Sequence, residues 1–348
     1  MKSNIKFSFI LPIFNEELFI SKTIDSLLAQ QTSYAFEIII ADGMSNDRTK
    51  KIIEEKLLFF KNIIYIENKS QIVSTGFNLA LSISRGEYII RVDGHSYLDK
   101  YFVENSIQIF KRIDADCVGG ATEHRSNTFI GNIIRIAQIS DFGTGGVPFR
   151  KKINKGMYVE TLAFGVYKRD VFSKIGGYDE ELIRNQDDEF NFRLIQDGGR
   201  IWLDPKIKSI YYTRNSLIKF IKQYFQYGFY KPLVMRKRNG MSSIRHIIPG
   251  IFVLVFFALF FLMAFNQNKI LFLLLLLSYS LTSVFHIIKI LKNESINPLS
   301  SLLLFVTYFL MHFSYGIGTI LGALFFKTLQ GSKRVVDTKF NKKLFNKI

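Results

Sequence analysis

The chain has 348 residues, with 46 Lys and Arg against 29 Asp and Glu, and a formal net charge of +17. Its single cysteine, Cys117, excludes an intrachain disulfide and a cysteine-based zinc cluster. The charge invites a nucleic-acid-binding interpretation, but the basic residues gather beside apolar segments, and the earlier part of the chain shows no basic, aromatic strand platform or recognition helix.

The first 120 residues alternate short buried-strand patterns with helical patterns. We expect strands at 7–12, 37–41, 62–67 and 86–92, and helices at 17–30, 48–60, 72–84 and 98–112. This alternation predicts βαβ units and a parallel sheet. Ligands of such sheets bind beyond the carboxyl ends of the strands. Polar residues follow three of the expected strands there, namely Asn15-Glu16, Asp42-Gly43 and Asp93-Gly94-His95.

Asp93 and His95 follow the fourth expected strand. Residues i and i+2 of an extended backbone point to the same side, so we expect these two side chains to hold one divalent cation. A carboxylate combined with substrate phosphates suits Mg²⁺ or Mn²⁺, and an imidazole favours Mn²⁺. The alternative is a solvated strand end, because a short Asp-x-His sequence also occurs by chance.

From about 120 to 210 the pattern is irregular and marked by glycine pairs, with helical stretches expected at 169–174 and 187–196. The segment 217–238 is aromatic and basic. Its composition is typical of a helix that lies in the membrane interface, with an ordinary packed helix as the alternative.

The region 247–326 is almost entirely apolar. Segments 247–265, 270–291 and 299–326 reach the length of about 19 to 20 residues that a hydrocarbon core requires. A group of basic residues precedes the first segment and predicts a cytoplasmic flank by the positive-inside rule: Lys231, Arg236, Lys237, Arg238 and Arg245. The amino-terminal residues lead directly into a strand pattern, without a signal peptide, so we expect the first domain to stay in the cytoplasm.

The carboxyl-terminal tail is also basic, which creates a conflict. Three complete spans would place this tail outside, against the charge rule. Two interpretations stay open: either the rule is violated, or the long third segment, which contains Gly316, Gly318 and Gly322, is re-entrant. The expected organisation is a catalytic domain at 1–215, an interface segment at 216–246, a transmembrane region at 247–330 and a basic tail at 331–348.

Several motifs occur in an order that resembles the family-2 glycosyltransferases, in particular the membrane-anchored subgroup related to succinoglycan glucosyltransferase. The resemblance covers about residues 6–235. It rests on Leu11-Pro12-Ile13-Phe14-Asn15-Glu16, on Ala41-Asp42-Gly43 with the residues up to Thr49, on Asp93-Gly94-His95 at the family's Asp-x-Asp position, and on Asn185-Gln186-Asp187-Asp188-Glu189 with the residues up to Arg193. It implies an α/β, Rossmann-like glycosyltransferase-A domain followed by carboxyl-terminal transmembrane helices.

The resemblance also assigns roles to individual residues. It implies that Asp187 is the catalytic base, with Asp188 and Glu189 as rivals, although acids at a helix start are favoured by the helix dipole in any case. The nucleotide-sugar would contact Pro12, Phe14, Glu16, Asp42 and Asp93, and the metal would bind Asp93 and His95. The acceptor and diphosphate side would be formed by Glu160, Thr161, Glu189, Gln223 and Tyr227.

The chain departs from the family pattern at four places, one of which is Gln186, where the family often has glutamate. Gly43 stands where a second aspartate is common, and His95 replaces the second aspartate of the metal motif. Gln226 and Tyr227 stand where processive members carry Arg and Trp, which weakens an assignment as a processive polymer synthase.

We therefore expect a metal-dependent, inverting glycosyltransferase at the inner membrane, with its catalytic domain in the cytoplasm. The donor would be a nucleotide-diphospho-sugar, UDP-linked as is commonest in the family, and the acceptor a polyprenyl-diphosphate-linked saccharide or another membrane acceptor in cell-surface polysaccharide or glycolipid synthesis. The alternative is a catalytically decayed membrane scaffold with a transferase-like fold. A transporter is poorly supported, because the spans are few and their histidines, His286 and His312, stand alone.

Overall fold

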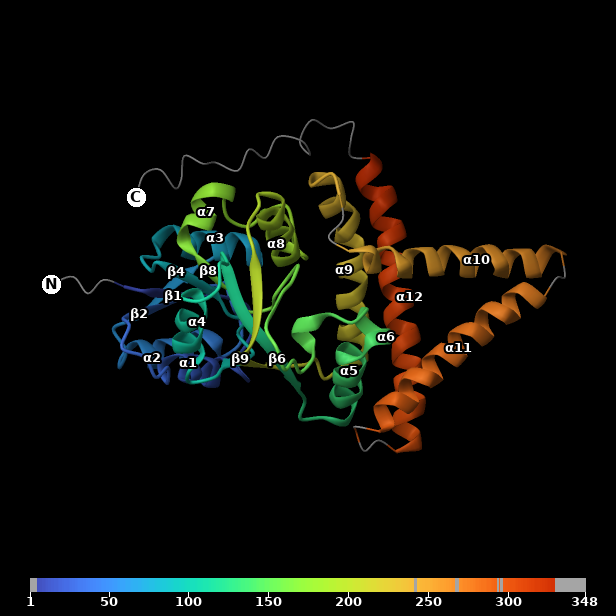
Figure 1. Ribbon diagram of the computed structural model, residues 1–348, viewed down its shortest axis with the longest axis horizontal. Coiled ribbons are helices and arrows are strands. Elements are labelled where there is room, and N and C mark those ends of the chain that lie inside the picture. The colour runs from blue at the N-terminus through green and yellow to red at the C-terminus, as the bar shows by residue number, and fades with distance from the viewer. Residues whose placement is uncertain (1–4, 241–242, 267–268, 293, 295–296, 329–348) are drawn as a thin grey trace. The chain divides into compact units, whose positions relative to one another are not determined.

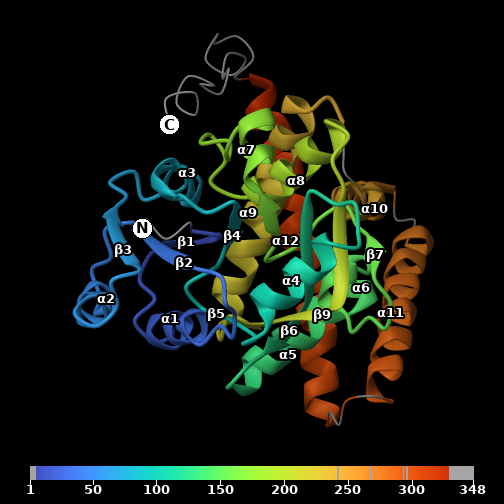
Figure 2. The ribbon, with the colours of Figure 1, turned by 60° about the vertical axis from the view of Figure 1, so that its left-hand side comes forward.

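The computed structural model describes residues 5–240, 243–266, 269–292, 294 and 297–328. The chain forms two compact units (Figures 1 and 2). The described part of the sheet unit comprises 5–123 and 151–212, and that of the helical unit comprises 124–150 and 213–328. The expected tail at 331–348 lies outside the described residues.

The sheet unit is built on a mixed sheet, whose strand order in the described residues is β3-β2-β1-β4-β8-β6-β9-β5, with β7 paired to β9. The neighbours β3, β2, β1 and β4 are parallel, which confirms the expected parallel sheet, whereas β8, β5 and β7 pair antiparallel. The strands are β1 Phe7–Ile13, β2 Phe36–Asp42, β3 Ile63–Glu67, β4 Tyr88–Arg91, β5 Ser96–Leu98, β6 Cys117–Arg125, β7 Met157–Tyr158, β8 Val166–Lys168 and β9 Ile201–Tyr212.

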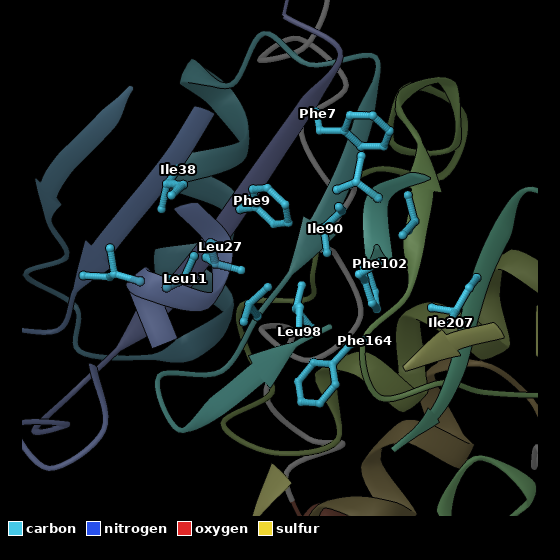
Figure 3. Packing of buried hydrophobic residues seen from close by; sticks show 14 of the residues in the cluster. Phe7, Phe9, Leu11, Leu27, Ile38, Ile90, Leu98, Phe102, Phe164 and Ile207 are labelled. Carbon is cyan, nitrogen blue, oxygen red and sulfur yellow. The ribbon is translucent and has the colours of Figure 1, made fainter. Parts of the chain in front are cut away.

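Helices connect these strands and cover the sheet. They are α1 Ile20–Leu28, α2 Thr49–Leu57, α3 Val73–Ile83, α4 Phe102–Phe110, α7 Arg169–Ile175 and α8 Gln186–Gln196. Every residue of β1 is buried, and its side chains pack with those of β2, β4, α1 and α4 in one core (Figure 3). This apolar packing fixes where each parallel strand ends, and the candidate site residues follow those ends.

The helical unit contains α5 Phe129–Ile139, α6 Asp141–Thr144, the short 3-10 helices η1 Pro148–Arg150 and η2 Ile244–His246, and the long helices α9 Leu217–Lys237, α10 Ile248–Asn266, α11 Ile270–Leu291 and α12 Pro298–Thr328. Residues 124–150 therefore group with the carboxyl-terminal helices, which differs from the continuous domain expected at 1–215. The reason is apolar packing, since Ile133, Ile134 and Ala137 of α5 cluster with side chains of α9 and α12.

Three helices of this unit are long and apolar enough to cross a membrane: Ile244–Phe265, Ile270–Leu291 and Pro298–Phe326. α12 is one continuous helix through Gly316, Gly318 and Gly322, so these glycines do not break it. They allow close helix contact instead. A Cβ added to Gly318 would lie 2.2 Å from the carbonyl oxygen of Phe225 on α9, and one added to Gly316 would lie 2.2 Å from that of Pro249 on α10.

Candidate active site

The candidate site of the sheet unit lies where β4 ends. The strand stops at Arg91, and Gly94 and His95 form a turn that leads into β5. The extended geometry assumed for Asp93 and His95 is therefore wrong, because the backbone turns between them. Because Asp93 and His95 are not in one extended strand, the alternation of side chains along a strand does not place them on the same side. A cation can bind both only if the turn itself brings the two side chains together.

Arg91 joins two of the sequence-predicted site residues. Its Nη2 donates to Asp93 Oδ1 at 2.5 Å, and its Nη1 donates to Asp187 Oδ2 at 3.3 Å. The Arg91 side chain is 10% exposed, whereas those of Asp93 and Asp187 are 23% and 38% exposed. Asp93, expected to bind a metal, and Asp187, expected to be the base, therefore contact one buried guanidinium, and both carboxylates are partly exposed.

Burial and the neighbouring charges have opposite effects on the pKa of the Arg91 guanidinium. Burial lowers the pKa of the Arg91 guanidinium, but the carboxylates of Asp93 and Asp187 raise it more, so the cation is permanent. Burial raises the pKa of the neighbouring Tyr178 hydroxyl, and the Arg91 charge only partly offsets this, which keeps Tyr178 protonated at neutral pH. Sequence reasoning missed both residues. For Arg91, the available signal was a basic residue at the end of a buried strand, two positions before Asp93.

His95 contacts a different predicted residue. Its Nδ1 lies 2.8 Å from Glu16 Oε1, and the ring packs against Tyr211 at 5.0 Å between centroids. A carboxylate on one imidazole nitrogen fixes the orientation of the ring, which is how metal-binding histidines are commonly held. Glu16 is itself anchored through its backbone N–H, which donates to Thr49 Oγ1.

The described residues contain no group of three His, Cys, Asp or Glu side chains gathered to hold a metal ion. A cation site with Asp93 as its carboxylate would have to be completed by a substrate diphosphate, because Mg²⁺ typically uses one or two carboxylates plus substrate phosphates. Buried polar atoms without a hydrogen-bond partner in the described structure also occur in this unit, on Arg91 Nε, Ser96 Oγ and Gln186 Oε1. Such atoms call for water or a ligand.

The start of α8 presents the acidic cluster. Asn185 precedes the helix in the left-handed conformation, with φ 63°. Asp187 Oδ1 accepts a hydrogen bond from the backbone N–H of Asp188, which leaves Oδ2 directed to Arg91. Asp187 is thereby connected to Arg91, the last residue of β4.

Glu189 has a different environment. It is fully buried, and its two carboxylate oxygens accept from Nε and Nη2 of Arg193, both at 3.0 Å. Arg193 Nη2 in turn donates to the carbonyl oxygen of Gly177 at 2.7 Å. Glu189 therefore holds Arg193 against the bend that follows α7, and this geometry gives no support to its expected contact with the acceptor or the diphosphate.

Asp42, expected to contact the base, is 1% exposed. Its Oδ2 accepts from the Tyr65 hydroxyl at 2.9 Å, and its Oδ1 accepts from the hydroxyl and the backbone N–H of Ser45. These contacts hold the loop after β2. They favour a structural role in shaping the turn, which is the alternative to a direct contact with the base.

The loop after β1 carries the other nucleotide-side residues. Pro12 is buried within β1, whereas Phe14 is 48% exposed and free to stack on a ligand. Asn15 does not cap a helix, since α1 begins only at Ile20. Its side chain instead exchanges two hydrogen bonds with Asn46, donating to the side-chain oxygen and accepting from the backbone N–H. The loops after β1 and β2 are therefore locked together.

The expected acceptor-side residues fall into both units. In the sheet unit, Thr161 Oγ1 accepts from Asn191 on α8 at 2.8 Å, which connects the loop containing Glu160 and Thr161 to the helix that carries Asp187. In the helical unit, Gln223 Nε2 donates to the Tyr227 hydroxyl at 2.8 Å, one turn apart on α9.

Comparison with known proteins identifies the family. Residues 8–176 match the model described as glycosyl transferase family 2. Residues 8–176 form a family-2 glycosyltransferase domain. The match covers the strands β1 to β4, the Asp93 motif and the segment up to Gly176, so the glycosyltransferase assignment includes the site residues that follow β1, β2 and β4.

Two curated relatives extend the similarity beyond this domain. The glycosyltransferase is 29% identical over 329 residues to a dolichyl N-acetyl-alpha-D-glucosaminyl phosphate 3-beta-D-2,3-diacetamido-2,3-dideoxy-beta-D-glucuronosyltransferase of Methanococcus voltae, covering 92% of this chain and 99% of that protein. It is 28% identical over 242 residues to the succinoglycan biosynthesis protein ExoA of Rhizobium meliloti, covering 69% and 73%.

A solved structure shares the fold. The mannosyltransferase PcManGT of Pyrobaculum calidifontis, in complex with GDP-Man and Mn²⁺, aligns with a TM-score of 0.60 and 15% identity over 94% of this chain and 89% of that one. This supports the glycosyltransferase-A fold expected from the sequence.

Proposed function

We propose that this glycosyltransferase transfers a sugar from a UDP-sugar to a saccharide carried on a membrane lipid phosphate or diphosphate, with inversion at the anomeric carbon, in the synthesis of a cell-surface polysaccharide or glycolipid. The observation that carries the proposal is the link between Asp93 and Asp187 through Arg91. Asp93, which we propose for the cation, and Asp187, which we propose as the base, contact the same guanidinium, although 94 positions separate them in the sequence.

In the proposed reaction Asp187 takes the proton of the acceptor hydroxyl as that oxygen attacks the anomeric carbon. A positioned base of this kind contributes roughly 10²- to 10⁴-fold to the rate. Attack from the face opposite the leaving diphosphate inverts the configuration. A divalent cation held by Asp93 and His95 would neutralise the charge that develops on the diphosphate. Glu16 would hold the imidazole of His95 in place, and Phe14 would provide an exposed aromatic face for the nucleoside.

The lipid acceptor is supported by the relatives and by the helical unit. The Methanococcus voltae relative is named for a dolichyl-phosphate-linked sugar acceptor, and ExoA for succinoglycan biosynthesis. The helical unit that carries the apolar helices also contains a cation, Arg150, whose Nε is buried without a hydrogen-bond partner among the described residues. The side chain of Arg150 is partly exposed, and its buried Nε calls for water or a ligand such as an anion.

The surroundings of Arg150 favour a phosphate. Its Nη1 reaches the carbonyl oxygen of Gln138 at 3.5 Å, and Tyr224 lies close enough to be influenced by its charge. Burial lowers the pKa of the nearby His124 to about 3, and the Arg150 charge contributes in the same direction, so His124 is neutral at pH 7. Arg150 and Arg135 therefore supply the positive charge near His124, and we assign Arg150, with Gln223 and Tyr227 on α9, to the acceptor side.

The proposed location is the inner membrane, with the catalytic unit on the cytoplasmic face, where nucleotide-sugars are available. A membrane-held enzyme confines the lipid acceptor and the active site to one plane, which increases the frequency of productive encounters.

A screen of radiolabelled nucleotide-sugars tests the function. Membranes that contain the full-length enzyme are incubated with several UDP- and GDP-sugars, and the label in the lipid extract is counted. We expect one donor to label the lipids with wild-type enzyme and not with Asp187→Asn. Failure of the wild-type enzyme to transfer from any donor would favour the catalytically decayed scaffold.

A further inference from the structure

The packing of α9 on α12 bears on the side of the membrane where the basic carboxyl-terminal tail lies. α12 has 31 residues and is about 46 Å long at 1.5 Å per residue, which exceeds a hydrocarbon core of about 30 Å. It is also the least hydrophobic of the three candidate spans, and 33% of its most apolar window is buried, against 11% for α10 and for α11. A larger share of α12 than of α10 or α11 is therefore covered by protein.

α9 covers α12 along most of its length. Phe220 and Tyr224 pack with Leu304, Tyr308 and Met311 near the beginning of α12. Phe229 packs with Phe326 near its end, and Arg236 Nη1 donates to the carbonyl oxygen of Phe326. Figures 1 and 2 show the two helices side by side.

This pairing constrains where α12 can lie. α9 carries five basic residues from one end to the other: Lys219, Lys222, Lys231, Arg236 and Lys237. If α12 crossed the bilayer, α9 would cross beside it and carry these charges through hydrocarbon, where each is expensive. A basic, aromatic helix is instead typical of the headgroup region.

The middle of α12 contacts backbone that hydrocarbon does not tolerate. His312 Nε2 lies 2.9 Å from the carbonyl oxygen of Phe142 in the four-residue helix α6. The backbone is extended at Ser140 just before α6 and left-handed at Gly145 just after it. Irregular backbone exposed to lipid does not occur inside a bilayer. The part of α12 around His312 therefore lies at the membrane surface or is shielded from lipid by protein.

α11 also contacts this part of α12 and α6, since the Tyr279 hydroxyl lies 3.1 Å from His312 Nδ1 and the Tyr279 ring packs on Phe142, but the tip of the α10–α11 hairpin extends away from them. The first part of α10 contacts the middle of α12, with Phe256 and Phe313 at 5.2 Å between ring centroids. Beyond Phe257 the aromatic contacts of α10 are with α10 itself and with α11, as in the pair Phe260–Phe272. Figure 1 shows the tip of this hairpin pointing away from α9 and α12. Exposed apolar side chains of this hairpin include Phe261, Phe265, Ile270, Leu273 and Leu274.

We propose that the α9–α12 pair lies along the headgroup layer of the bilayer, that the α10–α11 hairpin alone crosses the hydrocarbon, and that the tail lies on the same side as the sheet unit. α12 would dip one face into the membrane, since its exposed apolar residues Leu299, Leu302, Val306, Leu321 and Leu324 recur on one side of the helix. Both basic groups, before α10 and after α12, then lie on one side, as the positive-inside rule requires.

Cysteine labelling in cells tests this topology without any substrate, so its result is independent of the proposed reaction. Cys117 is fully buried and serves as the unlabelled background in the full-length chain. Lys269→Cys marks the α10–α11 connection, Lys343→Cys the tail, and Lys61→Cys the sheet unit. A membrane-impermeant maleimide is applied to intact cells and to inverted membrane vesicles.

We expect Lys269→Cys to be labelled only in intact cells, and Lys343→Cys and Lys61→Cys only in inverted vesicles. Labelling of Lys343→Cys in intact cells together with Lys269→Cys would establish three complete spans and overturn the proposal. Absence of Lys269→Cys labelling in intact cells, with labelling in inverted vesicles, would overturn the crossing hairpin. Lys222→Cys on α9 should react in inverted vesicles, and its failure to react there would place α9 inside the bilayer, against the proposal.

Discussion

Arg91 lies at the end of β4 and donates from Nη1 to Asp187 Oδ2 at 3.3 Å, across 96 positions of the sequence. The same guanidinium donates more closely, at 2.5 Å, to Asp93. A bound cation would compete with Arg91 for Asp93, whereas nothing in the proposed reaction displaces Arg91 from Asp187. Arg91 therefore connects Asp93, which we expect on the donor side, to Asp187, the proposed base.

Replacing Asp187 by Asn should reduce kcat by roughly 10²- to 10⁴-fold, because the isosteric amide cannot accept the proton of the acceptor hydroxyl. Donor binding should persist, measured as the affinity for the unreacted nucleotide-sugar by calorimetry. Asp188→Asn, at the adjacent position in the same helical turn, is the matched control. Equal losses in both variants would contradict the assignment of the base to Asp187.

Replacing Arg91 by Gln should lower kcat by about 10²-fold, since the orientation of Asp187 is lost. It should also reduce the Mn²⁺ concentration needed for half-maximal activity, because no guanidinium then competes for Asp93. A general folding defect would not produce this combination of slower turnover and tighter cation dependence. Arg85→Gln, which removes the guanidinium that pairs with buried Glu37, is the control and should leave the Mn²⁺ dependence unchanged.

Removing divalent cations with EDTA should stop turnover, and added Mn²⁺ should restore it. Asp93→Asn should raise the Mn²⁺ concentration required for activity by at least tenfold, because the remaining imidazole of His95 is neutral when it binds a metal. Activity that persists in EDTA would refute the metal role of Asp93 and His95 while leaving the role of Asp187 intact.

Replacing Glu189 by Ala should destabilise the protein by about 3–5 kcal/mol, the usual cost of leaving one partner of a buried ion pair uncompensated. The free energy of unfolding in detergent, obtained from urea titrations, measures the loss. Glu180→Ala provides the comparison, because that glutamate is exposed. If Glu189→Ala were as stable as wild type and lost only activity, Glu189 would instead have a direct catalytic role.

The buried His124 should make the stability of the chain depend on pH. Its folded-state pKa of about 3 lies below the ordinary value of 6.5, so the unfolded chain binds more protons between these values. The free energy of unfolding should therefore fall as the pH falls below 6.5, by about 2 kcal/mol between pH 7 and pH 5. His124→Gln should remove this part of the decrease, whereas His246→Gln should retain it.

The sequence predicted the parallel half of the sheet, because buried strands and amphipathic helices alternate locally and each pattern depends on near neighbours. It also predicted α8, α9 and the long apolar helices to within a few residues. The turn after Arg91 was missed, since the apolar pattern continues through Val92 and carries no sign of where pairing with β1 stops.

The roles of charged side chains were harder to predict, because their partners are remote in the chain. Glu189 and Asp187 stand two positions apart in one acidic run, yet one pairs with Arg193 in the core and the other with Arg91 at the site. Similarly, the grouping of 124–150 with the carboxyl-terminal helices depends on apolar contacts with α9 and α12, which no local pattern encodes.

The return of residues 124–150 to the helical unit has a practical consequence for anyone who wishes to produce a soluble enzyme. The polypeptide passes from one unit to the other after Glu123, before Lys151 and after Tyr212, so no single cut releases the sheet. A fragment that stops at residue 212 would retain α5 without α9 and α12, and would expose Ile133, Ile134, Ile136 and Ala137 to water. Such a fragment should aggregate, and excision of 124–150 with a short connector is the better starting point.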